Sequence, residues 1–161
     1  MGDKYKPHVF VFPEDSANQS IANGFERGVG VAQRAMTVMP AAGGWPRVRD
    51  KFAREIAPQL RKRPLQYVVL MVDFDEEEDR RAQVLGDVDP AIADRVFVVG
   101  CWSEPEDLRR ELGSFETIGA LLHKDCVDGT ATTWGHPLLK HNAAELARLN
   151  QSVRRIILPD A

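Results

Sequence analysis

The chain has 161 residues, of which 43% are hydrophobic and 28% are charged, and its formal net charge is −3 at pH 7. This composition is typical of one soluble globular domain and excludes a disordered protein or one that coats nucleic acid by bulk positive charge. No apolar run approaches the roughly 20 residues that span a bilayer, and residues 1–7 lack the apolar stretch of a secretory signal. Cys101 and Cys126 are too few for a disulfide framework, so we expect a cytoplasmic protein. The lack of a long apolar run leads us to expect no membrane partner.

Four short apolar runs predict four β-strands, at residues 8–12, 35–39, 67–72 and 95–100. The last two runs are continuously apolar rather than alternating, which is typical of strands buried on both faces of a parallel sheet. A further short strand is predicted at 156–158.

Amphipathic helices are predicted between these strands. Ser16 and Gln19 have the spacing of a capping box, so a helix is expected to begin with Ser16 as its N-cap. A stripe of apolar residues predicts a second helix from Pro46 to about Leu60, and a second capping box at 103–106 opens another helix.

The order of these elements predicts the fold class. Strands that alternate with amphipathic helices indicate an α/β fold, with a mostly parallel sheet of about four strands and helices on both faces, as in Rossmann-like folds. We expect one domain over residues 1–161, with a core at about 8–112 and a helical C-terminal extension at about 114–158.

Carboxylates follow two of the predicted strands, at the point where each strand ends. Glu14 comes after the first strand, and Asp73 and Asp75 come after the third. Ligand sites of open parallel sheets lie at the carboxyl ends of the strands, so we expect these three side chains to lie together there. Asp73 and Asp75 are two residues apart at the end of a strand, so their side chains are expected to point the same way. Carboxylate oxygens suit Mg²⁺ or Mn²⁺, and without a cation the clustered charges should raise at least one carboxyl pKa.

A second candidate site for an anion follows the second strand. Gly43 and Gly44 form a turn before a predicted helix, where backbone N–H groups can receive a phosphate. Arg47 and Lys51 are four residues apart on that helix and would form a phosphate track along one face. The basic stretch 47–63 can equally be an exposed helix face, and the sequence leaves both interpretations open.

A glutamate after the first strand and an Asp-x-Asp after a later parallel strand resemble the Toprim domain of topoisomerases, primases and nucleases of the overcoming-lysogenization-defect type. The resemblance covers about residues 8–104. It implies Mg²⁺-dependent phosphodiester chemistry, with Glu14 as general acid/base or ligand and Asp73 and Asp75 as metal ligands. Glu77 stands where many members carry a third Asp and is a further candidate ligand. The short chain argues against a topoisomerase or primase, so the resemblance implies a small Toprim-type nuclease acting on DNA or RNA.

The sequence also supports an alternative that involves no catalysis. Asp15 stands where Toprim domains usually have glycine, and the net charge is negative. Both features favour a Toprim-like or receiver-like interaction module that partners a larger protein such as an ATPase. Whether the chain is an enzyme is therefore left open by the sequence.

One further set of side chains contains residue types that bind zinc: His123, Cys126, His136 and His141. Their spacing matches no common zinc finger, so packing and capping roles are expected for them instead.

Overall fold

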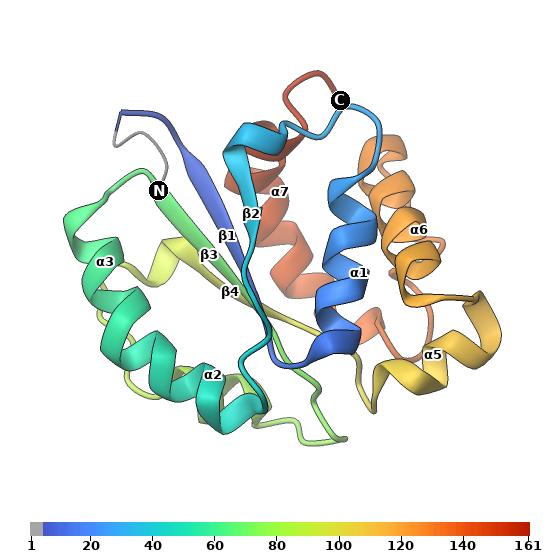
Figure 1. Ribbon diagram of the computed structural model, residues 1–161, viewed down its shortest axis with the longest axis horizontal. Coiled ribbons are helices and arrows are strands. Elements are labelled where there is room, and N and C mark those ends of the chain that lie inside the picture. The colour runs from blue at the N-terminus through green and yellow to red at the C-terminus, as the bar shows by residue number, and fades with distance from the viewer. Residues whose placement is uncertain (1–4) are drawn as a thin grey trace.

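A computed structural model describes residues 5–161, so the expectation of no secretory signal at residues 1–7 falls partly outside the described residues. Its centre is a four-stranded sheet in the order β2-β1-β3-β4, in which every neighbouring pair is parallel (Figure 1). The strands are β1 (His8–Pro13), β2 (Met36–Val38), β3 (Gln66–Met71) and β4 (Val96–Val99). This confirms the predicted parallel α/β fold.

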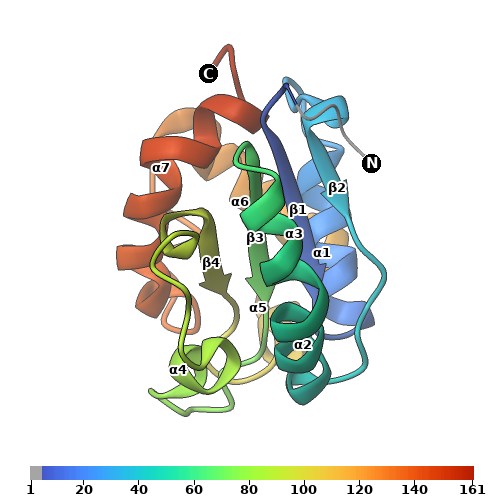
Figure 2. The same cartoon turned by 90° about the vertical axis from the view of Figure 1, so that its left-hand side faces the viewer.

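Helices cover both faces of the sheet, as the views in Figures 1 and 2 show. One face packs against α1 (Ser16–Glu26), α5 (Pro105–Leu112), α6 (Phe115–Asp128) and α7 (Ala143–Ile157). The other face packs against α2 (Trp45–Lys51), α3 (Ala57–Lys62) and α4 (Arg80–Leu85). Short 3₁₀ turns lie at Gln33–Ala35, Ala93–Arg95 and Lys140–Asn142. None of the helices within residues 5–161 combines the length and apolar character needed to cross a membrane.

The alternation of side chains along β1 explains why the sheet has two hydrophobic layers. Val9 and Val11 point into the core beneath α1, α6 and α7, whereas Phe10 and Phe12 point toward α2 and α3. All four side chains are buried. A strand that buries both faces reads as a continuous apolar run, which is the pattern that identified it.

Both predicted capping boxes are wrong in their first residue. Asp15, rather than Ser16, is the N-cap of α1, and its Oδ1 accepts a hydrogen bond from the Asn18 backbone N–H at 2.9 Å. Glu104, rather than Ser103, occupies the N-cap position of α5, because Pro105 takes the first helical position. The Ser103 hydroxyl instead donates to the Asp107 carboxylate at 2.7 Å.

Two further differences concern helices. The helix predicted from Pro46 to Leu60 contains a π-helical turn at Phe52–Ile56 between α2 and α3, where Pro58 supplies no N–H for a regular α-helical bond. The strand predicted at 156–158 is wrong, because α7 continues through Ile157. The helical stripe of α7 buries Ile157 against the sheet, so this apolar run completes a helix.

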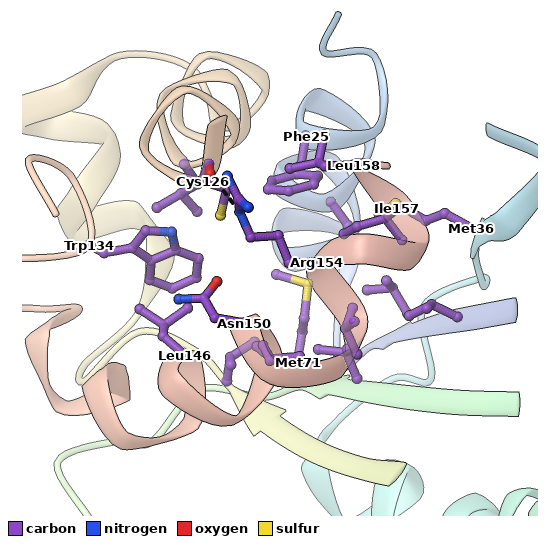
Figure 3. Close-up of a pocket in the computed structure, with 18 of the residues that line it drawn as sticks. Phe25, Met36, Met71, Cys126, Trp134, Leu146, Asn150, Arg154, Ile157 and Leu158 are labelled. Carbon is purple, nitrogen blue, oxygen red and sulfur yellow. Dashed lines mark hydrogen bonds between the residues drawn. The ribbon is translucent and has the colours of Figure 1, made fainter. Parts of the chain in front are cut away.

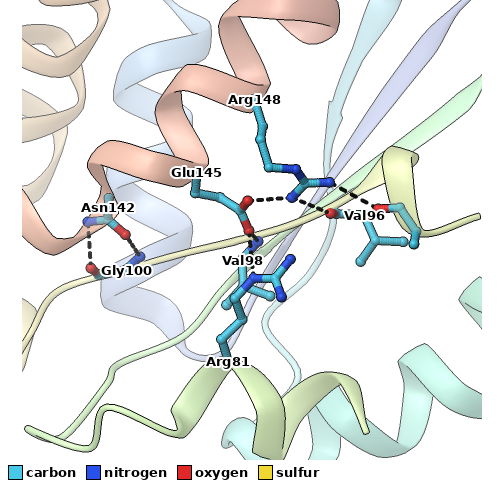
Figure 4. Close-up of polar contacts among 8 residues, drawn as sticks. Arg81, Val96, Val98, Gly100, Asn142, Glu145 and Arg148 are labelled. Atoms are coloured by element: carbon cyan, nitrogen blue, oxygen red, sulfur yellow. Dashed lines mark hydrogen bonds and ion pairs between the residues drawn. The ribbon is translucent and has the colours of Figure 1, made fainter. Parts of the chain in front are cut away.

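The outer edge of β4 is covered by side chains of α7 and of the turn before it (Figure 4). Three polar side chains bind backbone groups that a fifth strand would otherwise pair with. Asn142 accepts from the Gly100 N–H at 3.1 Å and donates to the Gly100 carbonyl at 3.0 Å. Glu145 accepts from the Val98 N–H at 2.8 Å. Arg148 donates to the Val96 carbonyl at 3.2 Å. We call Asn142, Glu145 and Arg148 the edge cover.

Candidate functional site

Two carboxylates meet at the carboxyl ends of the neighbouring strands β1 and β3. The Asp73 backbone N–H donates to Oε2 of Glu14 at 2.6 Å, and both residues are buried, each 8% exposed. The structure therefore brings these two residues together, as the position of their strands in the sheet requires.

A side chain that the sequence analysis missed links this pair to the start of α1. Nδ2 of Asn18 donates to Oδ1 of Asp73 at 2.9 Å and to Oδ1 of Asp15 at 3.0 Å. Asn18 is 1% exposed, so its amide is fixed inside the protein. The sequence did contain a signal for Asn18: it stands three positions after the N-cap Asp15, so its side chain lies at the same end of the helix. We call Glu14, Asp15, Asn18 and Asp73 the acidic edge.

Two carboxyls of the acidic edge, those of Glu14 and Asp73, have raised pKa values. Burial raises the pKa of Asp73 to about 7, and the charges of Glu14 and its acidic neighbours add to this, while the Asn18 hydrogen bond opposes it. Burial likewise raises the pKa of Glu14, against the Asp73 N–H hydrogen bond. No hydrogen bond or ion pair within residues 5–161 joins either carboxylate to a lysine or arginine. A raised pKa was expected from like-charge repulsion alone; at both residues burial is the larger cause and the acidic neighbours add to it.

Asp75 does not join Glu14 and Asp73 in one metal-binding group, so that part of the prediction is wrong, although its charge still acts on both carboxyls. Strand β3 ends at Met71, and the chain then turns, with Asp75 at φ 50° and Glu76 at φ 61°. Strand alternation no longer applies in this left-handed turn. Asp75 is exposed, and its Oδ2 lies 3.3 Å from Nη2 of Arg80. Glu77 is also exposed, and its backbone closes the turn onto Phe74.

Arg80 is a second residue of this region that the sequence analysis missed. Its guanidinium lies over the Trp45 ring, 4.4 Å from the ring centroid, and the residue is 5% exposed. Its Nε and Nη1 have no hydrogen-bond partner within the described part of the chain. Arg80 thus offsets the charge of Asp75 and holds the turn after β3 against α2.

The predicted metal ligands do not assemble into one group. Across residues 5–161, no set of three or more His, Cys, Asp or Glu side chains is placed to hold a metal ion. The remaining donors are the carboxylates of Glu14 and Asp73, which are hard oxygen ligands. Mg²⁺ is usually bound by one or two carboxylates, with water and substrate phosphates completing its shell, and this pair fits that mode.

The backbone N–H groups of the predicted phosphate-binding turn form hydrogen bonds within the protein. The N–H groups of Gly43 and Gly44 both donate to the Glu14 carbonyl oxygen, at 2.8 Å and 3.0 Å. Both glycines have positive φ, 97° and 124°, which the turn requires. These amides fix the backbone of Glu14, which argues against their predicted contact with a phosphate.

The two basic residues proposed for the phosphate track lie beside this turn. A Cβ added to Gly43 would be 3.1 Å from Nη1 of Arg47, so the Arg47 side chain folds over the turn. Nζ of Lys51 is 5.5 Å from the centroid of the Phe12 ring, two residues before Glu14. Both basic residues are exposed.

The histidines and the cysteine considered for zinc lie in separate environments. Nε2 of His123 is 3.0 Å from the Val29 carbonyl oxygen, and Nε2 of His136 is 2.6 Å from a Glu111 carboxylate oxygen. His141 packs among aromatic rings on the other face of the sheet. These contacts are of the packing and capping kind that the sequence analysis expected.

The described part of the chain also contains hollows that the sequence did not reveal. An apolar cavity of about 110 Å³ lies between the sheet and α1, α6 and α7, with Met71, Cys126 and Trp134 among its lining (Figure 3). An open cleft of about 430 Å³ lies beside the edge of β4, between α4 and the start of α7, and includes Phe74 and Trp102. Residues far apart in the sequence line both the cavity and the cleft, so no local motif marks them.

The comparisons provide no family to which these features can be assigned. The chain matches no protein-family model, no curated protein and no solved structure.

Proposed function

We propose that the acidic edge carries out Mg²⁺- or Mn²⁺-dependent phosphodiester chemistry on nucleic acid, as a small nuclease. The observation that carries this proposal is the buried pair of Glu14 and Asp73, both with raised pKa values and without a cationic partner among residues 5–161. Two buried carboxylates that repel each other are costly unless a cation compensates them. A divalent ion at this position would remove that cost.

The roles of the chain's own residues follow from their contacts. Glu14 and Asp73 would hold the ion, which when bound neutralises phosphate charge and makes a bound water more acidic. Asn18 holds the Asp73 carboxylate by its 2.9 Å hydrogen bond and so fixes its orientation. Glu14 can also accept or donate a proton, and its raised pKa makes it a better base than an ordinary carboxylate. Arg47 and Lys51 are exposed nearby and would attract the backbone of the nucleic acid.

The test combines metal binding and cleavage. Millimolar Mg²⁺ or Mn²⁺ should raise the melting temperature of the wild type, and labelled DNA or RNA should be cleaved only when the metal is present. Both effects should disappear in Glu14→Gln combined with Asp73→Asn. Asp79→Asn is the matched control, because Asp79 is an exposed acid near the same turn. If the wild type shows neither a thermal shift nor cleavage, the proposal is wrong.

A second candidate function is the interaction module without catalysis. It is favoured by the lack of a three-ligand metal group within residues 5–161 and by the pairing of Asp75 with Arg80 instead of with Asp73. In that case the acidic edge would be a structural feature, and a larger protein would be the partner. Binding of such a partner by the double variant as well as by the wild type would favour this function.

A further inference from the structure

The open cleft of about 430 Å³ lies directly beside the turn that carries Asp73 and Asp75. The Phe74 side chain, between these two acids in sequence, lines the cleft. The turn is bonded to the segment after β4: the Phe74 N–H donates to the Cys101 carbonyl at 2.9 Å, and the Glu76 N–H donates to the Trp102 carbonyl at 2.7 Å. The segment that carries Asp73 is therefore hydrogen-bonded to the segment that carries Trp102, and the two meet beside the cleft.

Three rings form the wall of this cleft. The Phe74 and Trp102 rings are stacked at 30° with centroids 6.3 Å apart, and the His141 ring meets Phe74 at 4.6 Å and Trp102 at 5.3 Å. Trp102 is only half-buried, so it presents ring surface to the cleft. We call Phe74, Trp102 and His141 with the space that they line the aromatic cleft.

His141 is the polar group in this wall that lacks an explanation from the fold. Its Nδ1 and Nε2 are both buried and neither makes a well-formed hydrogen bond within the described residues; the Gly100 backbone, which acts on the ring and opposes the effect of burial on its pKa, can satisfy at most one of them. Burial lowers the pKa of His141, so the ring is neutral at pH 7, with one N–H donor and one acceptor nitrogen. A buried polar group without a partner costs free energy, which a ligand that supplies the missing partners would recover.

The rim of the aromatic cleft carries charges of both signs. Arg81 and Lys140 line it together with Glu78 and Glu145; Arg81 is already paired with Glu145 at 3.0 Å, which leaves the exposed Lys140 as the cation for an anionic group. A ligand that fits must therefore have a flat, neutral part for the rings and can have an anionic part at the basic side of the rim.

We propose that the aromatic cleft binds an unpaired nucleobase of the nucleic acid whose phosphate lies at the acidic edge. Bases have flat faces that stack on aromatic side chains, and their edges carry donors and acceptors that His141 can satisfy. A paired base in a duplex has both faces and its pairing edge covered, so the substrate must be single-stranded or have a base turned out of the helix. That a base binds in the cleft does not depend on the proposed function. That this base belongs to a nucleic-acid substrate does rest on the proposed function.

The first experiment measures nucleoside binding without metal. Adenosine and uridine are titrated into the protein in EDTA, and binding is followed by changes in the ligand signals in NMR. The wild type should bind at least one of them saturably. His141→Phe keeps the ring and removes both nitrogens, so it should weaken binding about tenfold while the melting temperature stays the same or rises. Trp102→Leu should weaken binding about tenfold or more through lost stacking.

Trp134→Phe is the matched control, because Trp134 lines the separate apolar cavity and not the cleft. It should leave nucleoside binding unchanged. The inference is overturned if the folded wild type binds neither nucleoside up to their solubility, or if His141→Phe and Trp102→Leu bind as the wild type does.

The second experiment separates this inference from the proposed function. Single-stranded oligonucleotides with and without one abasic position are compared for binding in EDTA and for cleavage in Mg²⁺. Nucleoside binding without any cleavage would retain the aromatic cleft and reject the nuclease. If both oligonucleotides are cleaved equally fast and no nucleoside binds, the nuclease is retained and base binding in the cleft is rejected. A free nucleotide as the ligand would be indicated by adenosine monophosphate binding more tightly than any oligonucleotide.

Discussion

The backbone of Gly119 in α6 lies directly against the carbonyl oxygen of Ile21 in α1: a Cβ added to Gly119 would be 2.0 Å from that oxygen. Gly24 makes the reciprocal contact, with an added Cβ only 2.2 Å from the Glu116 carbonyl oxygen. The two helices therefore touch through their backbones. Since α1 carries Asp15 and Asn18, this contact also fixes the helix that supports Asp73.

Gly119→Ala should destabilise the protein by about 2 kcal/mol or more, because the new methyl group forces the two helices apart. Denaturant unfolding monitored by circular dichroism measures this change. Ala120→Ser, at the adjacent exposed position of α6, is the control and should change stability by less than about 0.5 kcal/mol. Equal stability of Gly119→Ala and the wild type would mean that α1 and α6 are not packed so closely.

Asp73 should make the metal-free protein less stable as pH rises. Its folded pKa of about 7 exceeds the ordinary value of 3.8, so the folded state binds more protons than the unfolded state between these values. The free energy of unfolding therefore falls as pH rises from about 4 to about 7. Asp73→Asn removes this titration while keeping an oxygen for Asn18, and should be more stable than the wild type at pH 7 in EDTA. Urea unfolding at pH 5 and pH 7.5 tests this, and a less stable variant at pH 7 would show that the carboxylate has a structural role.

Asp125 should show the opposite pH dependence. Burial alone would raise its pKa, but hydrogen bonds from Trp134, Thr130, Thr133 and Thr132 outweigh burial and lower the pKa below the usual value of 3.8. The stability that it contributes is present above that value and is lost as pH falls below it.

Asp125→Asn should cost about 2 kcal/mol at pH 7, because an amide cannot accept all of these hydrogen bonds. Chemical denaturation at pH 7 and pH 3 measures the difference, which should shrink at the lower pH. Asp128→Asn is the control, since Asp128 makes only an exposed pair with Lys124. A loss of stability at Asp128 as large as at Asp125 would contradict this account.

The turn after β3 contains backbone strain that glycine would relieve. Glu76 has φ 61°, a conformation that costs an ordinary L-residue about 1 kcal/mol. Glu76→Gly should stabilise the protein by about 0.5 kcal/mol after the extra entropy of the unfolded glycine is subtracted. Glu77→Gly, at a neighbouring position without positive φ, should instead destabilise it. Thermal unfolding of both variants decides this, and the same sign at both positions would argue against strain at Glu76.

The edge cover should contribute strongly to stability through Glu145. Its carboxylate is 8% exposed, accepts from the Val98 N–H at 2.8 Å and pairs with Arg148 and Arg81. Glu145→Ala leaves a buried N–H without a partner and should cost about 2–3 kcal/mol in a denaturant titration. Arg81→Ala removes only an exposed partner and should cost about 1 kcal/mol or less. A small effect at Glu145 would mean that water can replace its carboxylate at the edge of β4.

The sequence predicted the sheet well because buried parallel strands have an unmistakable composition. The runs at 67–72 and 95–100 are continuously apolar, and only a strand covered on both faces needs such a run. The edge cover could not be predicted in this way. Asn142, Glu145 and Arg148 recur at helical spacing, which is the pattern of a solvated helix face. Only the tertiary position of α7 turns these polar residues toward a strand.

The site was predictable only where strand geometry determines it. Glu14 and Asp73 come together because both directly follow neighbouring parallel strands. Asp75 was placed wrongly because strand alternation was extended beyond the predicted end of the strand at residue 72, and the sequence does not show that two non-glycine residues there adopt positive φ. Asn18 and Arg80 were missed because their roles depend on contacts with residues distant in sequence, Asp73 and Trp45.

The edge cover also matters during synthesis, because β4 leaves the ribosome before the residues that cover it. Strand β4 ends at Val99, whereas α7 begins only at Ala143, so the outer backbone groups of β4 are synthesised well before the side chains that bind them. Until α7 docks, the nascent protein presents an open strand edge that can pair with another chain. Variants that loosen α7 should therefore reduce soluble yield during expression more than their loss of equilibrium stability alone would suggest. The last helix acts, in this respect, as the protein's own protection against strand-to-strand aggregation.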